Sequence, residues 1–122
     1  MEDHQDGRRR LGRWGEDEAA RHLVRKGYEL IERGYRGLRG EIDIIARDGE
    51  MLVFVEVKTR TDEDFGPPEE AVTPAKQTQV RRIARAFLAE KGLGSPFCRF
   101  DVIAVEIAED GKPVLRHLID AF

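Results

Sequence analysis

Two apolar runs separated by a turn signal constrain the fold of this chain more than any other feature. The runs cover residues 42–47 and 51–58 and are rich in Ile, Val and Phe, and the dipeptide Asp48-Gly49 lies between them. Aspartate followed by glycine between two such runs is typical of a two-residue β-hairpin turn. The sequence therefore predicts a hairpin, and its apolar strands indicate central rather than edge positions in a sheet.

Charged residues interrupt both strands of this hairpin. With a two-residue turn at Asp48-Gly49, Asp43 faces Phe54 and Glu41 faces Glu56. Because side chains on a strand alternate between faces, these residues and Lys58 emerge on one face. Asp43 and Glu56 become diagonal neighbours, about 5–8 Å apart.

The opposite face of the predicted hairpin is apolar. It consists of Ile42, Ile44, Val53, Val55 and Val57. A three-residue turn would move the side chains of one strand to the other face, so this assignment depends on the turn.

The clustered carboxylates favour a cation site. Like charges opposed on a sheet destabilise it, and clustered carboxylates raise one another's pKa values. A hard ion such as Mg²⁺ takes oxygen ligands, and Glu41, Asp43 and Glu56 offer them. Lys58 could position or help deprotonate an attacking water and stabilise phosphate charge. The alternative is a solvated sheet face on which these residues form salt bridges.

Apolar periodicity predicts a helix over residues 13–26, ended by Lys26-Gly27. Glu16 leads the stripe that continues with Ala19, Ala20 and Leu23, so it is expected to face the sheet. Its alternative role is a first-turn carboxylate that complements the helix dipole.

A second helix is predicted between Thr73, as N-cap, and Gly92. Lys76 begins its apolar stripe at the positive end of the helix, a position suited to a phosphate. A snorkelling lysine explains the same position equally well.

The remaining elements give an α/β fold. Short strands are predicted at residues 28–31, 100–107 and 114–119, so the element order is α-β-β-β-α-β with one further strand. Residues 1–10 are expected to be a flexible tail, residues 11–122 a single domain, and residues 60–70 a flexible segment.

Charge is segregated along the chain although the total is only −3. Residues 21–40 and residues 72–92 each carry a net charge of +4, and the rest of the chain is acidic. This pattern is compatible with a basic face beside an acidic pocket, or with ordinary solvated surfaces.

Other features exclude several classes of protein. The longest apolar run, residues 51–55, is far shorter than the roughly 20 residues that span a bilayer. No signal peptide is visible, and the single Cys98 cannot form an internal disulfide. The three histidines share no zinc-ligand spacing. We therefore expect a cytoplasmic protein without a membrane partner.

With these residues in hand, the chain resembles the YraN-like family of bacterial endonuclease-like proteins, itself similar to archaeal Holliday junction resolvases and other PD-(D/E)xK nucleases. The resemblance covers about residues 12–106. The matching segments are Gly15-Glu16, Tyr35-Arg36, GEIDIIARDG (residues 40–49), VFVEVKTR (residues 53–60), Phe65-Gly66, Ala71-Val72 with Lys76, and RFDVIAV (residues 99–105).

This resemblance implies a restriction-endonuclease-like αβββαβ core, a mixed sheet flanked by helices. It also implies that Asp43, Glu56 and Lys58 take the D, E and K roles of the nuclease motif. The backbone carbonyl of Val57 would be a further metal ligand, and Glu16 matches a helical glutamate near the site. Gly34 replaces an asparagine usual in the family, and Ile42 replaces the proline of the nominal motif.

The leading functional hypothesis is a Mg²⁺-dependent endonuclease that acts on DNA, with branched or otherwise structured DNA as the candidate substrate. Mn²⁺ is expected to substitute for Mg²⁺. Cationic side chains would contact backbone phosphates without reading sequence. They are Arg36, Arg39, Lys76, Arg81 and Arg85. The alternatives are a non-catalytic nucleic-acid-binding module and a protein-interaction domain. Whether two protomers pair as a homodimer stays open.

Overall fold

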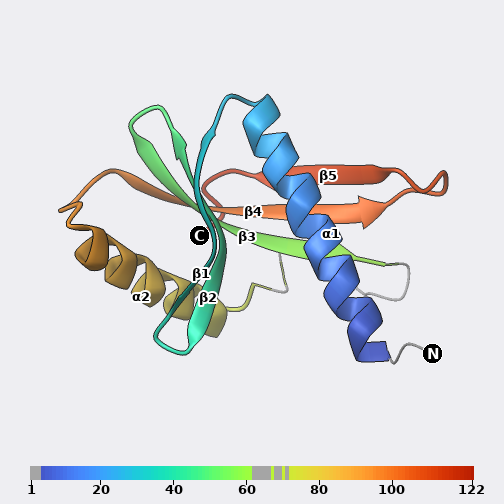
Figure 1. The fold of residues 1–122 in the computed structure, drawn as a ribbon, viewed down its shortest axis with the longest axis horizontal. Coiled ribbons are helices and arrows are strands. Elements are labelled where there is room, and N and C mark those ends of the chain that lie inside the picture. Colours follow the sequence, from blue (N-terminus) through green and yellow to red (C-terminus); the bar gives the residue numbers. More distant parts are fainter. Residues whose placement is uncertain (1–3, 62–66, 68–69, 71) are drawn as a thin grey trace.

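The computed structural model of this chain describes residues 4–61, 67, 70 and 72–122. Five strands form one mixed sheet in the order β1-β2-β3-β4-β5, and the two helices cover its opposite faces (Figure 1). The elements are α1 (His4–Arg25), β1 (Glu29–Gly37), β2 (Gly40–Asp48), β3 (Met51–Arg60), α2 (Pro74–Lys91), β4 (Cys98–Ile107) and β5 (Pro113–Leu118). The predicted αβββαβ core with a further strand is confirmed.

Helix α1 is longer than predicted. It begins at His4 and ends at Arg25, where Gly27 turns the chain with a φ of 90°. Residues 4–10, expected to be a flexible tail, are therefore helical, whereas residues 1–3 lie outside the described residues. The helix buries Ala19 and Leu23 against the sheet, so the predicted apolar stripe is confirmed.

Helix α2 begins and ends where the sequence predicted. The side chain of Thr73 accepts a hydrogen bond from the backbone N–H of Lys76 at 3.2 Å, and Pro74 occupies the first turn. Gly92 ends the helix in the left-handed conformation with a φ of 64°. These caps satisfy backbone groups that a helix end leaves unpaired.

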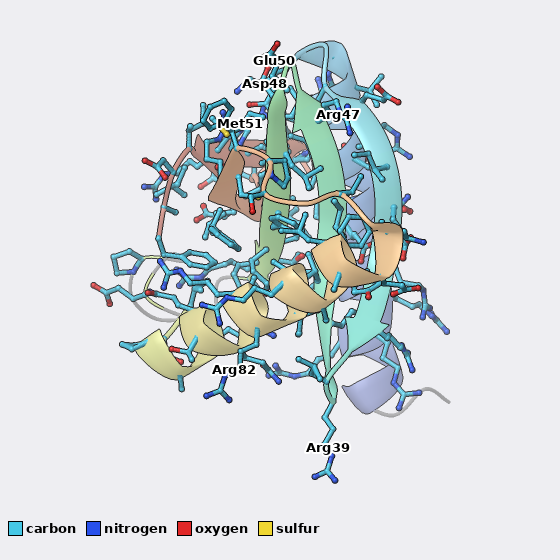
Figure 2. The ribbon with its side chains drawn as sticks, turned by 90° about the vertical axis from the view of Figure 1, so that its left-hand side faces the viewer. Arg39, Arg47, Asp48, Glu50, Met51 and Arg82 are labelled. Carbon is cyan, nitrogen blue, oxygen red and sulfur yellow. The ribbon has the colours of Figure 1, made fainter. Side chains whose placement is uncertain are left out.

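The turn between β2 and β3 differs from the prediction. Asp48 pairs with Met51, so the two turn residues are Gly49 and Glu50, at the end of the hairpin opposite Arg39 (Figure 2). Gly49 has a φ of 61°, and glycine is the residue favoured where the first central position needs a positive φ. The change shifts the register by two residues without exchanging the faces of β3.

The corrected register changes which residues face each other. Ile45 pairs with Phe54 and Ile44 with Val55. The ladder ends at the pair Ile44–Val55, so Asp43 and Glu56 lie just beyond its last pair. The predicted facing of Asp43 and Phe54 is wrong, because Phe54 pairs with Ile45.

One strand residue lies on an unexpected face. Ile44 packs with Val53 and Val55 on the α1 side, as predicted, but Ile42 packs with Phe54 on the α2 side. Regular alternation would put Ile42 and Ile44 on the same face, so the strand changes face at Asp43.

Strand β1 extends well beyond the short strand predicted at residues 28–31 and pairs with β2, with a shift of register between Leu30 and Glu32. The two strands are joined by a tight turn in which Gly37 pairs with Gly40. The segment at residues 60–70 falls largely outside the described residues. Neither helix in the described part of the chain is long and apolar enough to cross a membrane.

Candidate active site

Asp43 lies where the backbone pairing between β2 and β3 stops. Its Oδ2 accepts a hydrogen bond from the backbone N–H of Val57 at 2.8 Å, so the side chain takes the place of a main-chain acceptor. Burial raises the pKa of Asp43 to about 6. The nearby carboxylates of Glu16 and Glu41 also raise it, whereas the Val57 N–H and Lys76 lower it.

Glu56 is a buried acid on the neighbouring strand. It is 2% exposed, and its Oε1 has no hydrogen-bond partner among the described residues. Its Oε2 lies 3.7 Å from Nζ of Lys76. Burial raises the pKa of Glu56 to about 7, the carboxylate of Asp43 adds to the rise, and Lys76 and Lys58 oppose it. An additional cation would relieve the repulsion between the two acids.

Glu16 reaches this site because α1 approaches β3 closely. A Cβ on Gly15 would lie 1.9 Å from Oγ1 of Thr59, so only glycine permits the contact. Arg33 on β1 fixes the same turn of the helix, with Nε 3.1 Å from Glu16 and Nη2 2.6 Å from Asp17. The sheet-facing position predicted for Glu16 is therefore observed.

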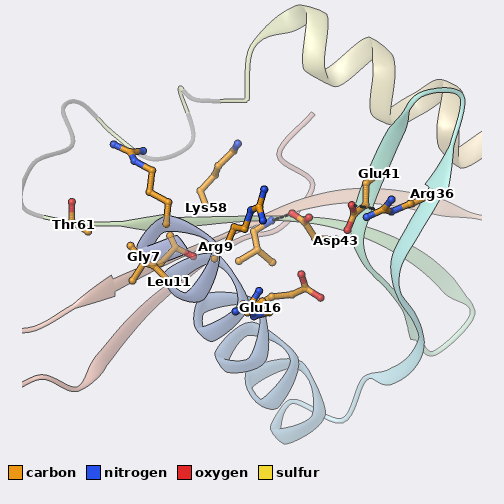
Figure 3. A pocket seen from close by; sticks show the side chains of 14 residues that line it. Gly7, Arg9, Leu11, Glu16, Arg36, Glu41, Asp43, Lys58 and Thr61 are labelled. Atoms are coloured by element: carbon orange, nitrogen blue, oxygen red, sulfur yellow. Dashed lines mark hydrogen bonds and ion pairs between the residues drawn. The ribbon is translucent and has the colours of Figure 1, made fainter. Parts of the chain in front are cut away.

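A hollow of about 820 Å³ is lined by Glu16 and Asp43, whereas Glu56 lies buried beside it and is not part of its lining. The carboxylates of Glu16, Glu41 and Asp43 are directed toward this space, and Lys58, which also lines it, extends from β3 away from α1 (Figure 3). The other lining residues come mainly from the N-terminal turns of α1 and the end of β3. They are Gly7, Arg8, Arg9, Leu11, Gly12, Arg13, Arg36, Val57, Thr59 and Thr61.

Sequence reasoning missed the arginines that α1 contributes to this hollow. Arg9 and Arg13 are one helical turn apart, but the residues before position 11 were expected to be a tail. The spacing of arginines at i and i+4 is the signal that could have revealed a helical cationic face.

The predicted phosphate-binding residues lie in three places. Arg36 and Arg39 lie at the β1–β2 turn, and the side chain of Arg36 is 86% exposed although its Nε is 3.8 Å from Glu41. Lys76 lies at the start of α2 beside Glu56. Arg81 and Arg85 lie further along α2 and line neither this hollow nor the turn.

Arg81 has an alternative role in packing. Its guanidinium lies over the rings of Phe100 and Phe122, at 5.6 Å and 5.4 Å from their centroids. Cations over aromatic faces are held by the ring quadrupole. Arg85 is an exposed residue of α2.

Comparison with known proteins identifies the family. The family model described as "Uncharacterised protein family UPF0102" matches residues 15–105. The chain belongs to this family. It is the YraN-like, nuclease-like family that the sequence motifs indicated, and the match spans every strand of the core from β1 to β3 as well as α2 and most of β4.

Curated UPF0102 relatives match nearly the whole chain. A UPF0102 protein of Geobacter sulfurreducens is 49% identical over 112 residues, which cover 92% of this chain and 88% of the relative. A UPF0102 protein of Symbiobacterium thermophilum is 50% identical over 114 residues, covering 93% and 97%. A UPF0102 protein of Pelotomaculum thermopropionicum is 43% identical over 118 residues, covering 96% and 98%.

The chemistry of this UPF0102 site fits a hard divalent ion. Asp43 and Glu56 supply carboxylate oxygens, and the unpartnered Oε1 of Glu56 is a buried acceptor that a cation would satisfy. Among the described residues no three His, Cys, Asp or Glu side chains form a ready metal cluster. Two carboxylates with a backbone carbonyl leave room for waters and substrate phosphate, as Mg²⁺ prefers.

Proposed function

We propose that this chain is a Mg²⁺-dependent DNA endonuclease of the bacterial cytoplasm that hydrolyses phosphodiester bonds, with Mn²⁺ as a substitute ion. The observation that carries the proposal is the pair formed by half-buried Asp43 and buried Glu56, whose pKa values desolvation raises to about 6 and about 7. Two mutually repelling acids destabilise a sheet unless a positive group offsets them. Asp43 opens onto a hollow that Arg9, Arg13 and Lys58 also line, which supports a phosphate substrate.

Each residue has a distinct task in this proposal. Asp43, Glu56 and the carbonyl of Val57 would hold the ion, and Glu41 would be an outer carboxylate. Bound Mg²⁺ supplies positive charge at the scissile phosphate and acidifies water. Lys58 would orient the attacking water and stabilise phosphate charge, and Glu16 would accept a hydrogen bond from that water.

Cationic side chains around the hollow would hold the DNA backbone. Arg36, Arg39 and Lys76 lie on the β1–β2 turn and on α2, and Arg9 and Arg13 lie on α1. Such contacts provide affinity without sequence specificity, and they weaken as salt rises. Arg85, and Arg81 if it leaves its aromatic partners, would extend the contact along α2. The near-neutral total charge does not oppose this arrangement, because Arg9, Arg13 and Arg36 line the hollow itself.

The decisive experiment compares nicking of labelled linear, flapped and four-way DNA by the wild type and by Asp43→Asn, with Mg²⁺, Mn²⁺ or EDTA. Wild type should cut with either metal, and Asp43→Asn should lower the rate by at least about 100-fold. Glu109→Gln removes an exposed acid away from the hollow and should cut normally. Equal cleavage by wild type and Asp43→Asn would refute the proposal.

One observation favours a second candidate, a non-catalytic nucleic-acid-binding module. Lys76 already places a positive charge 3.7 Å from Glu56, so the acids are partly compensated without a metal. This candidate predicts DNA binding in EDTA and no turnover with any divalent ion. Titration calorimetry that detects neither Mg²⁺ nor Mn²⁺ binding would support it over the nuclease.

Cutting both strands of a duplex would require two such sites. We include pairing of two protomers on DNA in the proposal, to be tested by light scattering of the protein with and without duplex. A mass of one protomer per duplex, together with nicking of a single strand, would show that the protein acts as a monomer and would refute the proposed homodimer.

A further inference from the structure

The turn between β1 and β2 holds two bulky residues in a conformation that favours glycine. Leu38 and Arg39 are its central residues, with φ values of 48° and 61°. Turns with two positive φ values usually carry asparagine and glycine, because a Cβ is strained there. Strained residues persist where the surrounding structure fixes them, and they concentrate at functional sites.

The surroundings of this turn hold it against α2. A Cβ on Gly40 would lie 2.7 Å from both Nε2 of Gln79 and Cδ1 of Ile83, so the strand sits directly on the helix. Gly40 also pairs with Gly37 across the turn. These contacts hold the strand ends at the base of the turn in a fixed position against α2.

Leu38 is a leucine without an apolar environment. It is 63% exposed, and it lines a hollow of about 590 Å³ together with Ala75, Lys76, Gln79 and Arg82. A single exposed leucine is ordinary on a protein surface. Packing does not explain why an exposed leucine occupies this turn, which is strained, is held against α2 and lies beside the candidate active site.

Cations without ion-pair partners flank this leucine. Within the described part of the chain, neither Arg39 nor Arg82 has a carboxylate within ion-pair distance. Figure 2 shows both side chains extending away from the body of the protein at the same end, Arg39 from the turn and Arg82 from α2. An apolar tip between free guanidinium groups is complementary to a surface that is both charged and locally apolar.

We propose that the β1–β2 turn is a wedge that recognises DNA whose base stack is interrupted, as at a flap, nick or mismatch. Leu38 would contact the exposed base face, and Arg39 and Arg82 would hold the flanking phosphates. An intact duplex offers only charged backbone and groove edges to this leucine. Apolar wedges do enter base steps, and opening a step is easiest where stacking is already broken. The inference rests on the proposed function and names its class of substrate.

The position of the turn also sets where cleavage falls. Leu38 and Asp43 are joined by a continuous strand, and a rise of about 3.3 Å per residue limits their separation to roughly 17 Å. Base pairs along a duplex are about 3.4 Å apart. Cuts should therefore lie within about five nucleotides of the interruption.

The test measures binding in EDTA, so that it does not depend on cleavage. Two duplexes of equal length are compared, one intact and one with a flap beside a 2-aminopurine reporter. Wild type should prefer the flapped duplex by about tenfold, a ratio within reach of burying one leucine side chain, and it should change the reporter fluorescence. Leu38→Asn suits the left-handed conformation but removes the apolar group, so it should fold normally and lose the preference.

Control variants separate this effect from general loss of affinity. Leu93→Asn replaces another exposed leucine, which is 39% exposed and outside both hollows, and should keep the preference. Arg39→Gln should weaken binding to both duplexes and reduce the salt slope by about one charge.

The outcomes distinguish the wedge from the nuclease. A wild type that binds both duplexes equally, or a folded Leu38→Asn protein that keeps the preference, overturns the wedge even if metal-dependent cleavage is found. A Leu38-dependent preference without cleavage in any metal supports the wedge and refutes the nuclease.

Discussion

Lys76 Nζ and Glu56 Oε2 lie 3.7 Å apart, so α2 delivers a cation to an acid that is almost completely buried in β3. The Glu56 side chain is 3% exposed and that of Lys76 is 31% exposed. The pair thus links the buried Glu56 to the smaller hollow that Lys76 lines together with Leu38 and Arg82. An ion entering beside Glu56 would meet this lysine.

Lys76→Met should therefore increase the affinity for Mg²⁺ in the absence of DNA. Removing a positive charge near the ion should tighten binding by about tenfold, the order of one close charge pair in a well-solvated setting. Titration calorimetry of the wild type, Lys76→Met and Lys76→Arg measures this. The arginine variant keeps the charge and should resemble the wild type; weaker Mg²⁺ binding by the methionine variant would contradict the expectation.

Metal-free stability should fall as pH rises through the titration of Glu56. Burial raises the folded pKa of this acid to about 7 from an ordinary value of 4.5, so the folded state retains a proton that the unfolded chain has released. Its favourable contribution is complete below about pH 4.5 and is lost toward pH 7, by on the order of 3 kcal/mol. Mg²⁺ should oppose the loss.

Urea unfolding in EDTA at pH 5 and pH 8 checks this prediction. The difference in unfolding free energy between Glu56→Gln and wild type should grow in favour of the glutamine variant as pH rises, because glutamine stays neutral. Groups that do not interact with Glu56 titrate alike in both proteins and cancel in the difference, whereas the coupled titration of Asp43 is part of it. A constant difference across this range would show that Glu56 is not the group responsible.

Gly15→Ala should damage both the packing of α1 and the site. The new methyl group would lie 1.9 Å from Oγ1 of Thr59, so the helix must move away from β3. Overpacking of this kind destabilises by about 1–3 kcal/mol. Thermal and urea unfolding measure the loss, and the double variant Gly15→Ala with Thr59→Gly should recover part of it. Gly12→Ala is the matched control, since a Cβ there contacts nothing within 4 Å.

Asp101→Asn should destabilise the fold without changing metal binding at the candidate active site. Asp101 is completely buried on β4, where His117 Nε2 lies 2.8 Å from Oδ2 and Arg99 Nε lies 2.9 Å from Oδ1. Removing one partner of a buried ion pair lowers the free energy of unfolding by about 3–5 kcal/mol. Urea unfolding should show this loss, while Mg²⁺ affinity of the remaining folded protein stays unchanged. Arg21→Gln, at an exposed ion pair, should cost far less.

The elements that the sequence predicted well are those controlled by local signals. The Thr73 cap, Pro74 and Gly92 define α2 through interactions within a few residues, and the structure has them in these roles. The hairpin itself was predictable because its two apolar runs flank a glycine. The nearness of Asp43 and Glu56 also follows from the hairpin, whichever two-residue turn is used.

The errors arose where distant contacts decide the structure. Asp48 can serve as a turn residue or as the last strand residue, and here its carboxylate receives a contact at 3.2 Å from Nη1 of Arg99, 51 residues away. The change of face at Asp43 depends on the N–H of Val57 in another strand. The first turns of α1 carry glycines and a run of arginines, which gave no apolar periodicity to detect.

The hairpin origin of the acidic pair has a kinetic consequence. Asp43 and Val57 are only 14 positions apart in the chain, whereas Lys76 arrives with a helix that follows the hairpin. Local contacts form early and long loops close late, so we expect the two acids to meet before their cation does. Refolding should then be slower at pH 8 than at pH 5, and Mg²⁺ added at the start should remove much of that delay.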